Sequence, residues 1–229
     1  SHARRPPMHE NYRPPETIVF FLTFLFAGLM LGGGINVAGL IMGFTATSEA
    51  DQSLGAFLTD LSGLVWLLVF PTGILFLMWH HRTSRNAHAL GAQGLSFSPL
   101  GCVLWWFCPL LNLFKPFSSI MELWRASDPT SVVDPYAWRL APVPALIPVW
   151  WSFWIFMGMV GQTTAEGWDP FGITERMAFF LALCTSLSLI PASLCAMLVV
   201  RGIHRRQLLR AHHLSKALHL PGQHPARAA

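Results

Sequence analysis

Five polar side chains stand out in this 229-residue sequence, because they lie in or beside long apolar segments. They are Asp60, Asn112, Lys115, Glu122 and Arg125. A charged group inside a membrane segment commonly marks a substrate, proton or ion pathway, since its burial in lipid is costly. The same groups can be architectural, as helix caps, headgroup contacts or a Glu–Arg pair three residues apart. Asp60 lies only about two turns into its segment, so both roles stay open for it.

The sequence patterns of common catalytic and metal sites are missing. There is no HExxH, no GxSxG and no phosphate-cradling glycine loop, and the four Cys lie singly in apolar segments. His80 and His81 are adjacent, so they cannot share a helical face, and we expect both to be solvated at a membrane interface. We therefore predict no enzyme activity, no catalytic residue, no metal site and no cofactor.

The composition is that of a polytopic membrane protein. Hydrophobic residues make up 53% of the chain and charged residues 11%, against about 25% charged residues in soluble domains. Ten Trp and seventeen Phe suit lipid-facing and interfacial surfaces. The net charge of +4 does not indicate nucleic-acid binding, because the basic residues flank apolar segments, where they orient helices.

Four apolar segments are long enough to span a membrane, which takes about 20 helical residues. They cover residues 17–44, 54–79, 142–160 and 173–202, and the second contains a Pro-Thr-Gly break at 71–73. The central segment 97–127 differs, because its apolar part is short and is interrupted by Pro109, Asn112, Lys115 and Pro116. We predict that it enters the bilayer, breaks at Pro109 and returns as a re-entrant hairpin, followed by an amphipathic interfacial helix over 117–127. The alternative is that it spans.

The charge distribution favours the hairpin. If the segment returns, Arg176 alone of the fifteen Lys and Arg lies on the far side, together with six of the eleven acids. If it spans, the basic tail lies outside, against the positive-inside bias. We therefore predict an all-α protein of four transmembrane helices plus the hairpin. Its parts are a cytoplasmic arm (1–16), a membrane domain (17–203) and a basic cytoplasmic tail (204–229).

The first span carries a stripe of small residues. Five positions fall within an arc of about 80° on a helix; they are Gly28, Gly32, Asn36, Gly39 and Gly43. Small residues let another helix approach closely, and Asn36 can hydrogen-bond across such a contact. We predict a helix-packing face, with a functional amide as the alternative, and expect Gly33, beside the stripe, to be more tolerant of substitution.

The five polar side chains receive specific architectural expectations. Asp60 shares a face with Leu64, Leu67 and Pro71, and we expect its side chain to point toward the interior of the helix bundle. Asn112 is expected to bond main-chain groups freed near Pro109, since an unpaired buried amide costs about 1–3 kcal/mol. Lys115 is expected to reach the cytoplasmic headgroups. Glu122 and Arg125 are expected to pair and to hold their helix against the 80–97 loop or a partner.

Two runs resemble a known family. They are RNAHALGAQGLSFSP and WWFCPLLNLFKPFSSIMELWRASDP, which are similar to the motifs "RNL.ALGA.G..FSP", "WWF.P..NL..P" and "..ELWRAS.P" of the uncharacterised bacterial membrane family called domain of unknown function 4328. The likeness is strong for about forty-five residues, here residues 85–127, and loose over the flanking spans. It implies a bacterial integral membrane protein. No activity comes with the resemblance, because the family has no assigned reaction.

These observations favour a membrane scaffold or accessory subunit, which makes helix–helix and lipid contacts within a larger complex. Its expected partners are membrane lipids and other integral membrane subunits or itself, with no nucleic acid. Its expected place is the bacterial inner membrane, with both termini cytoplasmic. The alternative is a transporter or channel for a small solute or ion, built around residues 97–127. Four spans without inverted repeats enclose little space, which counts against transport by a monomer.

Overall fold

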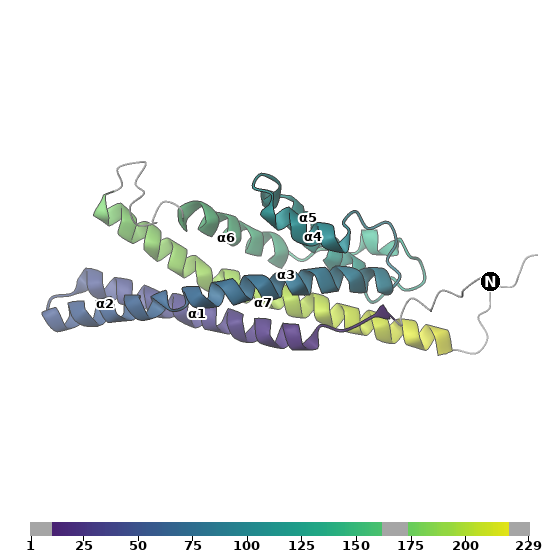
Figure 1. Ribbon diagram of the computed structural model, residues 1–229, viewed down its shortest axis with the longest axis horizontal. Coiled ribbons are helices and arrows are strands. Elements are labelled where there is room, and N and C mark those ends of the chain that lie inside the picture. Colours follow the sequence, from purple (N-terminus) through teal and green to yellow (C-terminus); the bar gives the residue numbers. More distant parts are fainter. Residues whose placement is uncertain (1–10, 162–173, 220–229) are drawn as a thin grey trace, which may run out of the picture. The chain divides into compact units, whose positions relative to one another are not determined.

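The fold is helical throughout the residues that the computed structural model describes, 11–161 and 174–219 (Figure 1). No strand occurs within these two ranges, so the prediction of an all-α chain is confirmed. The chain divides into two compact units. The long-helix unit comprises residues 16–79 and 144–201. The hairpin unit comprises residues 1–15, 80–143 and 202–229.

The long-helix unit begins with two antiparallel helices, α1 (Glu16–Thr45) and α2 (Glu49–Gly63), which lie side by side (Figure 1). Ser48 starts α2, because its Oγ accepts a hydrogen bond from the main-chain N–H of Asp51 at 3.2 Å. The unit also contains α6 and the first parts of α3 and α7. These helices span Trp66–Ala89 (α3), Leu146–Gly161 (α6) and Glu175–His219 (α7).

The second apolar segment breaks at a different place from the one predicted. The break lies between α2 and α3, at Leu64 and Val65, and not at 71–73. The main-chain N–H of Val65 bonds the carbonyl oxygen of Ser62 at 2.9 Å, which is the three-residue spacing of a tighter turn. Pro71 lies inside α3. Because a proline ring crowds the carbonyl four residues before it, its effect falls on the turn that begins α3.

Three helices are long and apolar enough to cross a membrane. They are α1, the α2–α3 pair taken together (Glu49–Ala89), and α7 over Glu175–Ala217. Long apolar helices of this kind indicate a membrane protein. The predicted third span is shorter in the structure, because prolines at 142 and 144 delay the start of α6. α6 has 16 residues, or about 24 Å of helix. Among the described residues, the four predicted spans thus appear as three long helices and one shorter apolar helix.

The hairpin unit is built on the predicted central segment. α4 (Pro99–Leu104) and the short 3₁₀ turn Trp105–Phe107 form one arm, and the turn Leu111–Leu113 with α5 (Lys115–Ala126) forms the other. The two arms are bent by 117°. Cys108 is extended (φ −93°, ψ 106°), as favoured for a residue before proline. The helix therefore breaks at Pro109, where the sequence predicts it.

The basic tail is not a separate part of the fold. We predicted a boundary between residues 203 and 204, but α7 continues through it without interruption to His219. Ile203, Gln207 and Arg210 are buried on one face of this continuation, at the spacing of a helix that packs. Residues 80–143 group with this end of α7 in one compact unit. The end of the tail, 220–229, lies outside the described residues.

Candidate functional site

The glycine stripe of α1 lies against α2 and the start of α3 in one antiparallel register. A Cβ built on Gly32 would overlap the side chain of Val65, and one on Gly39 would lie 2.8 Å from the main-chain nitrogen of Thr59. As the residue number rises along α1, the number of the residue in contact on α2–α3 falls. The close pairs are Gly28–Leu68, Gly32–Val65, Gly39–Thr59 and Gly43–Gly55. Small residues here permit close approach of main chains.

Asn36 points to a different helix. Its Nδ2 donates to Ser186 Oγ of α7 at 2.9 Å, and that hydroxyl donates in turn to Ala182 O. Gly33 lies on the same side, where an added Cβ would stand 3.2 Å from Ser186 O. The stripe therefore serves two contacts. An added Cβ at Gly33 is less crowded than one at Gly32 or Gly39, as the sequence predicts, although Gly33 is not in open space.

Asp60 and Asn112 do not occupy their predicted environments. Asp60 is exposed, and so are Leu64 and Leu67, so the face that these residues share points outward. Asn112 uses its main-chain N–H, which bonds Cys108 O at 2.7 Å. Its side-chain Oδ1 is buried and has no hydrogen-bond partner in the described part of the chain. The predicted amide contact to the broken main chain is therefore wrong.

Glu122 closes the hairpin at its base. Its two carboxylate oxygens each accept a hydrogen bond from the main-chain N–H of Ser96 at 3.0 Å, and Oε1 also accepts from Phe97 N–H at 3.3 Å. This contact holds α5 against the end of the connection between α3 and α4. The predicted loop over 80–97 is shorter in the structure, because α3 continues to Ala89. Arg125 does not pair with Glu122 within the described residues, where the ion pair found joins two other side chains.

Lys115 begins α5 and is exposed. Its Nζ lies 5.9 Å from the ring centroid of Phe97 and 5.8 Å from that of Trp105. Both distances fall in the range of cation–π attraction. The aromatic rings thus hold the ammonium group at the start of α5 while leaving it accessible.

His80 joins both arms of the hairpin to α3. It is fully buried, so the expectation of a solvated histidine is wrong. Trp106 Nε1 donates to His80 Nδ1 at 3.2 Å, and an indole nitrogen is only a donor. Neutral His80 therefore carries its hydrogen on Nε2 and donates to Ser119 Oγ at 3.0 Å, and the serine donates to Pro116 O at 2.9 Å. This tautomer cannot take a proton from Ser119, so the cluster is a structural anchor.

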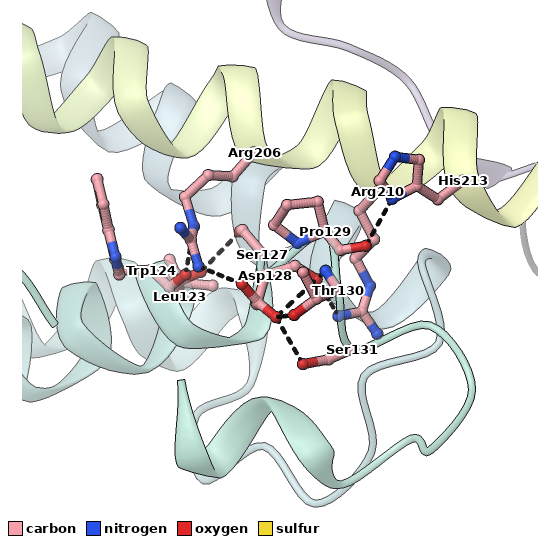
Figure 2. A network of polar contacts seen from close by, with 10 residues as sticks. All are labelled: Leu123, Trp124, Ser127, Asp128, Pro129, Thr130, Ser131, Arg206, Arg210 and His213. Carbon is pink, nitrogen blue, oxygen red and sulfur yellow. Dashed lines mark hydrogen bonds and ion pairs between the residues drawn. The ribbon is translucent and has the colours of Figure 1, made fainter. Parts of the chain in front are cut away.

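A second polar cluster fixes the end of α5 to α7, and Figure 2 shows it. Arg206 Nη2 contacts Asp128 Oδ1 at 2.9 Å, and Arg206 Nε donates to Trp124 O at 3.2 Å. The other carboxylate oxygen of Asp128 accepts from the hydroxyls of Thr130 and Ser131. Both carboxylate oxygens are therefore occupied by protein donors.

These contacts also set the acidity of Asp128. Burial raises its pKa, but the hydrogen bonds from Thr130 and Ser131 and the charge of Arg206 outweigh burial, so the pKa lies below the ordinary value. Asp128 is consequently a carboxylate at neutral pH and does not act as an acid there.

Arg210 and Gln207 extend this cluster inside the hairpin unit. Arg210 is buried, and its Nε donates to Leu90 O at 3.1 Å. Its Nη1 donates to Asp128 O at 3.0 Å (Figure 2). Gln207 Nε2 donates to Thr83 O at 2.9 Å. Asn86 exchanges two hydrogen bonds with the main chain of Arg13. These three side chains thus bind main-chain groups of their own unit.

Sequence reasoning missed His80, Asn86, Asp128 and the inward side chains of α7. A signal for the last group exists, because Ile203, Arg206, Gln207 and Arg210 recur at the three- and four-residue spacing of a buried helix face. Most of these residues are polar, so the spacing is not recognised as that of a buried face. No three His, Cys, Asp or Glu side chains gather into a metal-binding group in the ranges that the structure describes.

The comparisons with known proteins agree with the motifs. The model of one family, "Domain of unknown function (DUF4328)", matches residues 45–205, which is more than half of the chain. No curated protein and no solved structure matches. The resemblance carried by residues 85–127 is confirmed, and the chain belongs to the family of the domain of unknown function DUF4328.

Proposed function

We propose that this protein is an integral scaffold or accessory subunit of the bacterial inner membrane, without enzyme activity, which holds other membrane subunits or copies of itself. The proposal rests on the observation that several of its polar groups form hydrogen bonds and an ion pair within the protein. The carboxylates of Glu122 and Asp128 and the guanidinium of Arg210 are bonded to the protein itself. Large apolar side chains instead face outward, among them Phe24, Leu31, Leu67, Phe70, Phe107 and Leu110.

We further propose that residues 97–127 form a re-entrant hairpin, with residues 80–97, the 127–141 linker and both termini cytoplasmic. The bond between Ser96 and Glu122 supports this topology. A segment that crossed the bilayer would separate its two ends by about 30 Å, whereas these residues lie in hydrogen-bond contact. A second contact across the segment also supports this topology, because Gln93 N–H donates to Pro135 O at 3.0 Å.

Transport is the second candidate, and one observation favours it. Asn112 Oδ1 is a buried acceptor without a partner in the described ranges, and it lies beside the break of the hairpin, where pores and carriers expose polar groups. A carrier of this kind would use Asn112 together with the exposed Lys115.

Abundance measured against phenotype separates the two functions. In a strain that lacks the protein and shows a growth defect, Lys115→Gln and Asn112→Ala are compared with Gly32→Leu. A scaffold predicts that Lys115→Gln rescues growth, and that Gly32→Leu fails in proportion to its loss from the membrane. Loss of rescue by Lys115→Gln and Asn112→Ala at normal membrane abundance would overturn the scaffold and favour transport.

A further inference from the structure

The hairpin unit has far more positive than negative side chains. Its described residues contain ten Lys and Arg but three acids, Glu122, Asp128 and Asp134. Each of the three acids already has a partner. Glu122 accepts hydrogen bonds from the main chain of Ser96 and Phe97, and Asp128 pairs with Arg206. Asp134 accepts the main-chain N–H of Tyr136 at 2.8 Å. The positive charge of the unit is therefore not neutralised from within.

Six of these cations are exposed, and none of the six contacts a carboxylate within the described residues. They are Arg13, Arg85, Lys115, Arg139, Arg205 and Lys216. The inward arginines of α7, by contrast, are satisfied by Asp128 and by main-chain oxygens. Exposed cations without a nearby carboxylate give the unit a positive potential, which favours an anionic partner.

Lys115 shows which anionic partner fits. It directly follows Phe114, and the hairpin tip beside it exposes large apolar side chains, with 68% of Phe107, 79% of Leu110 and 66% of Phe114 accessible. An exposed ammonium group between two aromatic rings and next to an apolar surface matches a lipid, whose phosphate lies at the level of interfacial Trp and whose acyl chains lie deeper. A soluble anion would leave this apolar surface in water.

We infer that the hairpin unit is a binding surface for anionic phospholipids, in which Lys115 contacts the headgroup phosphate and the exposed apolar tip contacts the acyl chains. The inference rests on the proposed insertion of the hairpin into the membrane and adds the chemistry of its lipid partner. Each basic residue near an anionic surface contributes about 1 kcal/mol, so loss of one contact corresponds to about a fivefold change in preference.

The test uses the full chain in nanodiscs of equal phosphatidylcholine and phosphatidylglycerol. The lipids that stay bound after mild detergent release are counted by native mass spectrometry. We expect the wild-type protein to retain phosphatidylglycerol over phosphatidylcholine, and Lys115→Gln to lower that ratio about fivefold. Lys115→Arg should keep the ratio. Arg176→Gln removes the same charge from an exposed residue at the start of α7 and should leave the ratio unchanged.

Equal retention of the two lipids by the wild-type protein would overturn the inference, as would equal ratios for Lys115→Gln and Arg176→Gln. Alkaline carbonate extraction of native membranes, done in parallel, tests the proposed function separately. Release of the chain by carbonate would contradict the proposal that it is an integral membrane protein. A chain that resists carbonate but shows no phosphatidylglycerol preference contradicts the lipid surface alone.

Discussion

The carboxylate of Glu122 accepts the main-chain N–H of Ser96 at 3.0 Å with both of its oxygens, although 26 residues separate the two along the chain. The contact joins the end of one loop to the middle of α5. Since hydrogen bonds to a charged group contribute about 1.5–3 kcal/mol, it fixes the two ends of the hairpin together.

The first prediction concerns topology. A reporter fused after Arg139 and one fused after Ala229 should both read cytoplasmic, because the proposed re-entrant hairpin returns to the side from which it enters. A periplasmic result at Arg139 alone would show that residues 97–127 span the membrane. Glu122→Ala should leave the orientation unchanged, since orientation follows the basic residues, and should lower the thermal stability of the purified protein.

The second prediction concerns close packing along α1. Gly32→Leu should destabilise the protein by several kcal/mol or abolish its accumulation, because a Cβ at Gly32 already overlaps Val65. Gly34→Leu is the matched control, since nothing lies within 4 Å of a Cβ at that position. Melting temperatures in one detergent measure both variants. Similar losses for the two would show that α1 does not pack through this face.

The third prediction concerns the buried ion pair. Asp128→Asn should cost about 2 kcal/mol at pH 7, because Arg206 loses a charged partner. The folded-state pKa of Asp128 lies below its unfolded value of about 3.9. Its contribution is therefore fully present above that value and is lost as pH falls through the folded pKa. The difference in unfolding free energy between the two proteins should therefore be constant above about pH 4 and shrink as pH falls further, and a difference that does not shrink in acid would contradict the pairing.

The fourth prediction concerns the anchor at His80. Trp106→Phe should lower stability by about 1–3 kcal/mol, because it leaves the buried Nδ1 of His80 without this donor. Trp105→Phe is its neighbour control and removes only part of the ring that faces Lys115. Denaturation in mixed micelles compares the two. A larger loss for Trp105→Phe would contradict the hydrogen-bonded anchor.

Features with a local cause could be predicted from the sequence. Pro109 breaks the hairpin because a proline constrains its own residue and the one before it, and α1 is found within one residue of its predicted ends. Features that depend on a distant partner could not. His80 is polar and adjacent to a second histidine, and its burial depends on contacts with residues distant in the sequence, among them Trp106 and Ser119.

The glycine stripe shows the same limit in one helix. Its spacing predicts a close contact, but Asn36 and Gly33 lie against α7 while Gly32 and Gly39 lie against α2 and α3. A pattern of small residues gives the width of a packing surface and does not tell how many helices share it.

The bond between Asp128 and Arg206 has a practical consequence for anyone who shortens this protein. The family match ends at residue 205, one residue before the arginine that neutralises Asp128, and it starts at residue 45, after every glycine of the α1 stripe. A fragment trimmed to the shared region would retain all the family's characteristic motifs. It would also expose an unpaired carboxylate and leave Val65 and Thr59 without the helix against which they pack. Trimming should therefore begin no later than residue 13, whose main chain bonds Asn86, and end no earlier than residue 213, since His213 of α7 contacts Pro129 O.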